Sequence, residues 1–238
     1  MDGRPGILAQ LARAVVDEDS ETPLPLRLCR TYVAVVDADG GAITLAYTQP
    51  ERVTLCATNA TADRLEDLQE VLGEGPGRDA FTSGQIVEAG LVGEQTQRWP
   101  MFAKAARSAI GEVTLYAFPM RSGSEIIGVL SVYQAARRPL QQERADAQFL
   151  ADAVGAAIVR DSGSRADLSS ESWMVRDKIH QATGMVVAQL AISPEDALAL
   201  IRAYAFSEDM GLGSLAIEVI ERRRNFSLDN DAPGNERT

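Results

Sequence analysis

Two consecutive stretches decide the fold of the C-terminal part of this chain: IHQATGMVVAQL at residues 179–190 and SPEDALALIRAYAF at residues 193–206. In the first stretch, apolar side chains recur with the spacing of one helix face, at Ile179, Ala182, Val186 and Leu190. The second stretch opens with Ser193, Pro194 and two acids, which together are a strong helix start. The helix it predicts buries Ala197, Leu200, Ile201, Tyr204 and Ala205.

A third short helix is predicted after a break at Gly211 and Gly213. Ser214 is expected to cap this helix, and its apolar face holds Leu215, Ala216, Val219 and Ile220. Small residues recur where the helices would meet, so three helices can pack within roughly 50 residues, near the lower limit for independent folding. The size suits a module appended to a larger domain.

The same segment resembles the ANTAR family. The resemblance rests on four strings in the family's order and at fitting spacing: IHQATGM, SPEDAL, LIRAYAF and LAIEVI. ANTAR domains bind RNA and prevent premature transcription termination. The resemblance therefore implies that residues 172–226 bind paired RNA stem-loops in a nascent transcript, and that the protein is a homodimer, because two hairpins need two modules.

Arg202 is the foremost candidate for contact with RNA, since a guanidinium can bond a phosphate or stack on an unpaired base. Thr183 stands where many relatives have Lys, and Tyr204 suits either base stacking or the core. The arginines that close the third helix suit either the RNA backbone or the negative helix end. The full set expected to contact RNA is Lys178, Thr183, Arg202, Tyr204, Ser214, Arg222, Arg223 and Arg224.

The charge distribution limits what kind of nucleic-acid binding is possible. The whole chain has a formal net charge of −11, but residues 172–225 hold six basic and seven acidic side chains, a net charge of −1. The acidity therefore belongs mostly to the rest of the protein. A nearly neutral module argues against non-specific coating of nucleic acid and gives only weak electrostatic support for RNA binding.

The preceding residues, 1–160, are predicted to form an α+β domain, an antiparallel sheet flanked by helices. Helical patterns cover residues 5–17, 24–36, 62–72 and 140–160, with a further helix from Trp99. Strand patterns cover residues 42–47, 52–58, 85–88, 114–120 and 126–134, the last two joined as a hairpin. Polar residues 161–171 are expected to be a linker, and residues 227–238 a disordered tail.

Residues 22–160 also resemble the GAF fold, in the form that often precedes ANTAR modules. The resemblance rests on GEGPGRDAF at residues 73–81, Trp99–Phe102, Phe118–Met120 and Ile127–Tyr133. It implies a sensory or dimerising domain with a modest pocket for an unknown small molecule, although a purely structural domain stays open. The expected pocket residues are Gly75, Gly77, Phe81, Trp99 and Phe102. Many relatives have Cys at the position of Gly77, so thiol chemistry at that loop is not expected.

The composition offers little for catalysis. His180 is the only histidine, and Cys29 and Cys56 are the only cysteines, without metal-ligand spacing. We expect no enzyme, cofactor or metal site, and two separate buried thiols in a reducing cytoplasm. The acids Asp37, Asp39, Asp63, Glu66 and Asp67 are expected on the solvated surface. No apolar run reaches the roughly 18–20 residues of a membrane span, and the N-terminus lacks the order of a signal peptide, so we expect a cytoplasmic protein without membrane contact.

Three alternatives stay open. The terminal helices suit a DNA-binding regulator, although no recognition helix is obvious, or a sensing or protein-interaction module without nucleic acid; an enzyme is the third. A homodimer is expected through helices 5–17 and 140–160, because the second helix carries a wide apolar stripe. The alternative is that this stripe packs on the sheet. Its members are Leu140, Ala147, Leu150, Ala151, Val154 and Ile158.

Overall fold

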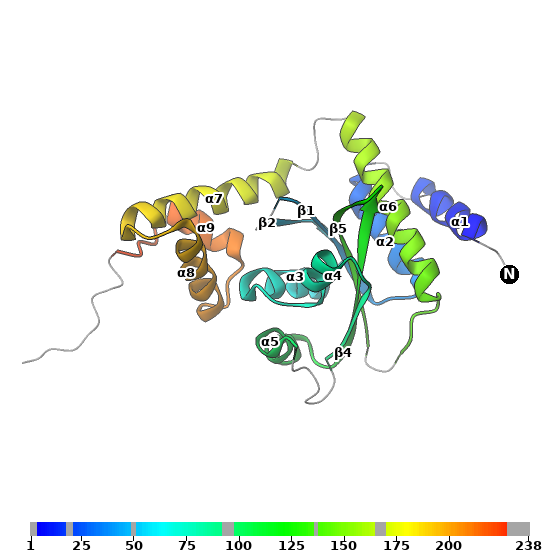
Figure 1. The fold of residues 1–238 in the computed structure, drawn as a ribbon, viewed down its shortest axis with the longest axis horizontal. Coiled ribbons are helices and arrows are strands. Elements are labelled where there is room, and N and C mark those ends of the chain that lie inside the picture. The colour runs from blue at the N-terminus through cyan, green and yellow to red at the C-terminus, as the bar shows by residue number, and fades with distance from the viewer. Residues whose placement is uncertain are drawn as a thin grey trace, which may run out of the picture. The chain divides into compact units, whose positions relative to one another are not determined.

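The computed structural model describes residues 4–17, 21–48, 51–91, 98–135, 138–164 and 170–227. The chain divides into two compact units, Met1–Ser172 and Trp173–Thr238, and each is described by itself. Figure 1 shows the sheet and its helices in the first unit, and a group of helices in the second.

The sheet of the first unit has five strands among the described residues, in the order β2-β1-β5-β4-β3. All neighbouring strands are antiparallel, as the sequence predicted. The strands are β1 (Gly40–Thr48), β2 (Glu51–Ala57), β3 (Val87–Gly90), β4 (Val113–Ser122) and β5 (Glu125–Ala135). The β4–β5 connection is a tight hairpin in which Gly123 has a φ of 63°, a conformation that favours glycine.

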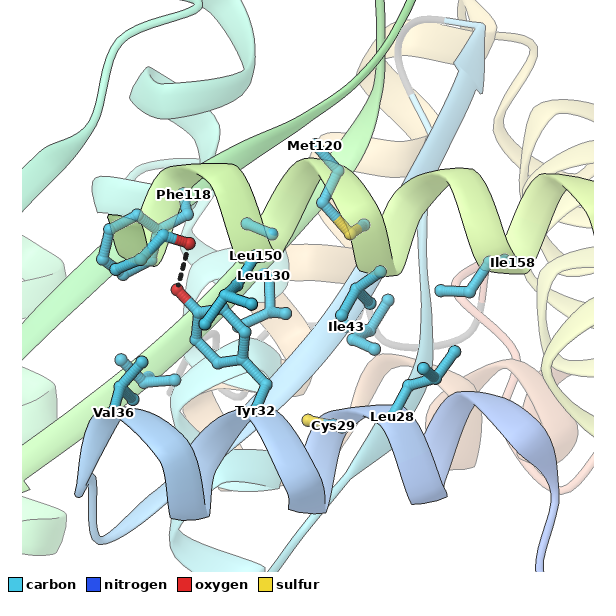
Figure 2. Close-up of a cluster of buried hydrophobic side chains, with 14 of the residues drawn as sticks. Leu28, Cys29, Tyr32, Val36, Ile43, Phe118, Met120, Leu130, Leu150 and Ile158 are labelled. Carbon is cyan, nitrogen blue, oxygen red and sulfur yellow. Dashed lines mark hydrogen bonds between the residues drawn. The ribbon is translucent and has the colours of Figure 1, made fainter. Parts of the chain in front are cut away.

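One face of the sheet is covered by α2 (Leu24–Val36) and α6 (Arg144–Ser164), and α1 (Arg4–Asp17) packs against both helices. Figure 2 shows Tyr32 and Leu150 reaching between these helices and the sheet. The Tyr32 hydroxyl donates a hydrogen bond to the Ala147 carbonyl at 3.0 Å, which satisfies its buried polar atom. At Gly155, an added Cβ would lie 2.9 Å from the Met120 Cβ, so this glycine lets α6 approach β4 closely.

The apolar stripe of α6 is therefore committed to the protein's own core. Five of its six predicted members are at most 1% exposed within the single chain: Ala147, Leu150, Ala151, Val154 and Ile158. The sixth, Leu140, lies before the helix, which begins at Arg144 and not at residue 140, and it packs half-buried against the same core. The alternative that the stripe packs on the sheet is confirmed, and the stripe gives no evidence for a dimer. A homodimer through α1 and α6 stays a prediction that would have to use their outer faces.

The opposite face of the sheet carries α3 (Ala60–Leu72), α4 (Pro76–Ser83) and α5 (Pro100–Ile110). A second hydrophobic cluster, which includes Leu65, Leu115 and Phe102, lies between these helices and the sheet. The glycine-rich segment at residues 73–77, which the sequence suggests is a loop, is partly helical. Pro76 and Gly77 already belong to α4, because proline is well suited to the first helical position.

The second unit contains the three predicted helices, α7 (Ser170–Leu190), α8 (Pro194–Ser207) and α9 (Leu212–Ile220). The predicted start of α8 is confirmed: Ser193 Oγ accepts a hydrogen bond from the Asp196 amide at 3.1 Å. The prediction that Ser214 caps α9 is wrong, since Gly211 occupies the cap position and Ser214 lies inside the helix. Leu200 is also exposed instead of buried, because the buried face of α8 is centred on Ala197, Leu198, Ile201 and Ala205.

The predicted linker, residues 161–171, is helical at both ends, because α6 extends to Ser164 and α7 begins at Ser170. Residues 165–169 and the predicted tail from residue 228 onward lie outside the described residues. Among the described residues, no single helix has the length and apolar character needed to cross a membrane. One pair, Asp177–Leu190 with Pro194–Ser207, meets the length and composition requirements only when both helices are taken together across a 107° bend.

Candidate sensory face and candidate RNA-binding surface

A chain of buried polar side chains connects the sheet to α3 and α4. Thr44 on β1 lies 3.2 Å from the Thr54 hydroxyl and donates to Glu66 Oε2 at 3.0 Å. Gln69 Nε2 donates to Glu66 Oε1 at 2.9 Å, and the Gly77 amide donates to Gln69 Oε1 at 2.7 Å. This series of hydrogen-bonded side chains runs from the edge strand β2 to the first turn of α4, and we call it the Glu66 chain.

Glu66 is only 4% exposed, so the prediction that it is a solvated surface acid is wrong. Both carboxylate oxygens accept hydrogen bonds, which is the usual condition for burying a carboxylate. Glu66 and Gln69 are three residues apart and flank the apolar stripe of α3, a pattern that puts both on one helix face. That spacing was the available sequence signal for this pair.

Four of the five expected pocket residues are held on this face by hydrogen bonds or close packing. Gly75 has a φ of 145° and lies so close to Gln69 that an added Cβ would be 2.5 Å from Gln69 Cγ. Gly77 donates to Gln69, as described above. The Trp99 indole donates to Asp79 Oδ2 at 3.0 Å, and the Phe102 amide donates to Glu74 Oε1 at 2.8 Å.

Phe81 packs half-buried against the same hydrophobic cluster as Trp99 and Phe102. The structure therefore brings all five residues to one face of the sheet. Phe102 is fully buried and Trp99 nearly so, which means that these two side chains also serve as core. A pocket between them stays a prediction.

Ser131 is a polar residue of this face that the sequence analysis missed. Its side chain is 7% exposed, and its hydroxyl has no hydrogen-bond partner within the described residues. In the sheet, Ser131 lies opposite Ala42 on one side and Ala117 on the other, so its neighbours are small. The sequence signal for this residue was a hydroxyl in the middle of the apolar run Ile127–Tyr133. Because buried polar groups usually have hydrogen-bond partners, such a hydroxyl indicates a position where a partner is needed.

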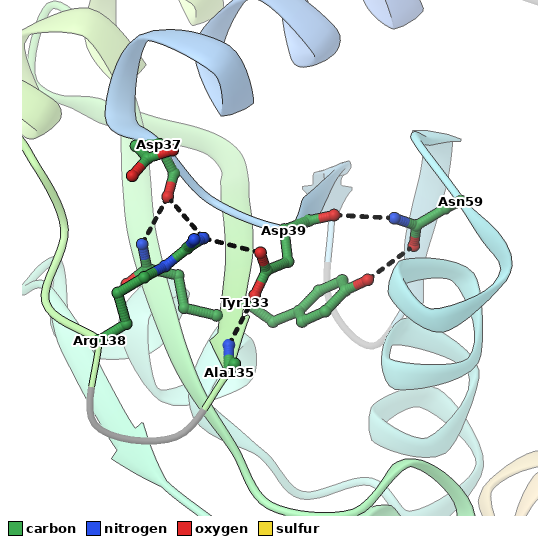
Figure 3. Close-up of polar contacts among 7 residues, drawn as sticks. Asp37, Asp39, Asn59, Tyr133, Ala135 and Arg138 are labelled. Carbon is green, nitrogen blue, oxygen red and sulfur yellow. Dashed lines mark hydrogen bonds and ion pairs between the residues drawn. The ribbon is translucent and has the colours of Figure 1, made fainter.

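A second polar cluster lies at one end of the sheet, where α2, β2 and β5 end and β1 begins (Figure 3). The Asp39 carboxylate accepts from the Ala135 amide at 2.6 Å and pairs with Arg138 at 2.7 Å. Asn59 donates to the Asp39 carbonyl at 3.0 Å and accepts from the Tyr133 hydroxyl at 3.2 Å. Asp39 is therefore a structural acid instead of a freely solvated one.

Asp67 on α3 differs from a solvated acid in another way. Burial, followed by the negative charge of Asp63, raises the pKa of the Asp67 carboxyl from 3.8 to about 6. The ionised form of Asp67 is therefore disfavoured in the folded protein. Among the described residues, no group of three or more His, Cys, Asp or Glu side chains is arranged to hold a metal ion.

In the second unit, three aromatic and basic side chains meet where the chain leaves α9. The Arg224 guanidinium lies over the Tyr204 ring at 4.9 Å, and the Tyr204 and Phe226 rings meet edge to face at 5.4 Å. Arg224 also pairs with Glu218 at 3.4 Å, and the Phe226 amide donates to Gln189 Oε1 at 3.0 Å. We call Tyr204, Arg224 and Phe226 the Tyr204 cluster; sequence reasoning missed Phe226, which it had placed at the end of the module.

The remaining candidate RNA contacts lie on all three helices of this unit and just beyond α9. The Thr183 hydroxyl donates to the Ile179 carbonyl at 2.8 Å, so it is occupied by its own helix. Arg202 and Lys178 are half-buried, and Ser214 and Arg222 are exposed. Arg223 is exposed and pairs with Glu221 at 2.5 Å. Of the eight candidates, Tyr204 and Arg224 are in contact with each other.

A family model for GAF domains matches residues 26–158, more than half of the chain, so the chain belongs to the GAF family. One similar solved structure is the A. aeolicus NLH2 GAF domain in an inactive state, with 10% identity over 64% of this chain and 90% of that one, and a TM-score of 0.42.

Another similar structure is the GAF domain of a phosphoenolpyruvate-protein phosphotransferase from Coxiella burnetii. It has 16% identity over 68% of this chain and 97% of that one, with a TM-score of 0.49. No curated protein matches the chain. The family match ends at residue 158 and therefore bears on the first unit alone.

Proposed function

We propose that this protein is a cytoplasmic transcription regulator in which the GAF domain receives a signal and the C-terminal unit binds structured RNA. Binding would hold paired stem-loops of a nascent transcript in a form that blocks the terminator hairpin. The observation that carries the proposal is the four-part ANTAR-like pattern, which lies on α7, α8 and α9 in the family's order. The proposal assigns no catalytic step to the protein.

The placement of the basic side chains supports selective contact with RNA. Arg222 and Arg223 are exposed beyond α9, while Arg224 is held over the Tyr204 ring. A base can stack on an aromatic ring or on a guanidinium plane, and guanidinium groups bond phosphates. Because the unit is nearly neutral overall, such contacts favour a defined RNA shape over any polyanion.

The GAF face supports a small polar molecule as the signal. The Ser131 hydroxyl lacks a partner within the described residues, and the Glu66 chain brings further donors and acceptors to the same face. A ligand with a hydroxyl or carbonyl group would satisfy Ser131, which gains free energy because an unpaired buried hydroxyl is costly. The proposal therefore includes an organic ligand without a metal or covalent cofactor.

The experiment is a binding comparison with the full-length protein. Fluorescence anisotropy is measured with a two-hairpin RNA, a single hairpin, an unstructured RNA of equal length and a duplex DNA, each over a range of salt concentrations. We expect the two-hairpin RNA to bind most tightly, with a shallow salt dependence because few phosphates are contacted. Equal affinity for all four nucleic acids, or tighter binding to duplex DNA, would refute the RNA-binding proposal.

A protein-interaction role is the second candidate, and it rests on α8. Leu200 and Phe206 are large apolar side chains on this helix, both 41% exposed, and a partner protein would bury them. If the protein fails to bind any of the four nucleic acids, substitution of these two residues and capture of partner proteins become the decisive measurements.

A further inference from the structure

The fold brings together the only two cysteines of the chain, which stand 27 positions apart in the sequence. Cys29 lies on α2 and is fully buried in the hydrophobic core, where Figure 2 shows it beside Leu28 and Tyr32. Cys56 lies on β2, is half-exposed, and packs against the same core. Cys56 is the largest influence that raises the pKa of the Cys29 thiol, so the two thiols are neighbours in the fold. The expectation of two buried thiols holds for Cys29 and is wrong for Cys56.

The surrounding elements hold the pair in place. Cys56 is opposite Ile43 in the β1–β2 ladder, and Ile43 is fully buried in the core that also contains Cys29. α2 packs directly on β2, so the two residues approach across a helix–sheet contact and not across a loose loop. Both cysteines are free thiols in this structure.

We propose that Cys29 and Cys56 form a dithiol that a peroxide oxidises to an intramolecular disulfide. The proposal is independent of RNA binding, and its substrate class is hydrogen peroxide or a small organic hydroperoxide. Cys56 is more exposed than Cys29, and we assign the order in which the two cysteines react from this difference.

Cys56, the accessible thiol, is oxidised first. Its sulfur attacks one peroxide oxygen, the O–O bond breaks, and the products are a Cys56 sulfenic acid and one water, or an alcohol from an organic hydroperoxide. Cys29 then acts as the resolving thiol. Its sulfur attacks the Cys56 sulfur, the S–O bond breaks, and the departing hydroxide takes the Cys29 proton to form water. Two thiols and one hydrogen peroxide thus give one disulfide and two waters.

The burial of Cys29 separates its role from that of Cys56. The interaction with Cys56, together with burial, raises the pKa of the Cys29 thiol, which keeps it protonated and unreactive toward peroxide in bulk solvent. Attack on the neighbouring Cys56 sulfur requires no access from solvent, and the hydroxide that leaves Cys56 removes the Cys29 proton as the S–S bond forms. The resulting bond would tie α2 to β2, which is an edge strand of the sheet.

The test is oxidation of the reduced full-length protein with hydrogen peroxide, followed by thiol blocking and peptide mass analysis without reduction. We expect loss of both free thiols in the monomeric chain, a linked peptide pair containing Cys29 and Cys56, and full reversal by dithiothreitol. The disulfide should also raise the melting temperature by several degrees, because it restricts the unfolded chain.

Two variants separate the roles of the sulfurs. In Cys29→Ala, we expect a Cys56 sulfenic acid that dimedone traps and no disulfide within the chain. In Cys56→Ser, a substitution at the half-exposed position, Cys29 should resist the peroxide concentration that oxidises the wild type. The proposal is overturned if wild-type thiols survive that treatment, if the disulfide joins two chains, or if Cys29 in Cys56→Ser is oxidised as fast as in the wild type. If Cys29→Ala fails to fold, the wild-type map and Cys56→Ser decide the matter.

Discussion

At the scale of single residues, Asp67 makes folding depend on pH in an unusual direction. The pKa of its carboxyl rises from 3.8 to about 6 on folding, so between these values the folded state binds more protons than the unfolded state. Asp67 therefore costs stability as the pH rises from about 4 to about 6, and this cost persists at neutral pH.

We expect Asp67→Asn to raise the melting temperature at pH 7.5 and to leave it nearly unchanged at pH 4. The gain should be about 1 kcal/mol in the free energy of unfolding, since partial exposure screens much of the charge effect. Thermal melts of the variant and the wild type at both pH values provide the measurement. Glu112→Gln, an exposed neutralising change in the same unit, is the control. A difference that does not vary with pH would contradict the role of Asp67.

The basic residues beyond α9 allow a test of RNA contact that leaves the core untouched. Arg222 and Arg223 are exposed, so changing either to Ala should not alter folding. Each change should weaken binding of the two-hairpin RNA by about 1–3 kcal/mol if it removes a charged contact. Arg13→Ala removes an equally exposed arginine from the other unit and should bind as the wild type does. Equal effects of all three changes would mean that only net charge matters.

Arg202 needs a more careful comparison, because it already interacts within the chain and is half-buried. Arg202→Ala should weaken RNA binding by about 1–3 kcal/mol, with a smaller loss of stability. Ala205→Leu should instead destabilise the unit by about 1–3 kcal/mol, since Ala205 is fully buried and added volume strains the packing. Anisotropy and thermal melting together separate the two. If Arg202→Ala binds a two-hairpin RNA like the wild type, its proposed contact with RNA is wrong.

At the scale of elements, the two predicted helix caps lead to opposite expectations. Ser193 Oγ accepts the Asp196 amide and donates to Asp196 Oδ2 at 2.6 Å, whereas Ser214 lies inside α9. Ser193→Ala should therefore cost about 1 kcal/mol in the free energy of unfolding. Ser214→Ala should be neutral or slightly stabilising, because alanine is the better helix former. Equal destabilisation by both changes, measured by denaturant unfolding, would restore Ser214 as a cap.

The same contrast shows what local sequence can and cannot specify about an element. Pro194 and the acids behind Ser193 left one possible start for α8. For α9, the sequence indicated Ser214 as the cap, but the helix begins at Leu212 with Gly211 in the cap position, and Leu212 is buried. The fully buried Leu212 adds a turn of apolar contact if the helix begins before it, so packing selected the earlier start.

At the scale of the whole molecule, the homodimer prediction can be sharpened. If α1 and α6 form the interface, it must use apolar groups on their outer faces. These are Leu8, Val16 and Val159, which are 38%, 76% and 37% exposed. We expect light scattering to show a dimer at micromolar concentration, and Val16→Glu to raise its dissociation constant by on the order of tenfold or more. Met101→Glu, at a 49% exposed position on α5, is the control. A wild-type protein that is monomeric at this concentration would contradict the homodimer prediction.

The sequence by itself determined the order and kind of most elements, since strand alternation, helix periodicity and the Ser193-Pro194 start are local signals. It also indicated the GAF family, through strings between residues 73 and 133, and the family model that matches residues 26–158 confirms this. Only the tertiary structure decided which polar groups are buried and which pairs meet. Glu66 and Thr44 come from separate elements, as do Cys29 and Cys56, and no periodicity within one element specifies a contact between two. Likewise, the α6 stripe would be apolar whether it formed a dimer interface or packed on the sheet. Only the tertiary structure shows that it packs on the sheet, where both surfaces are removed from water.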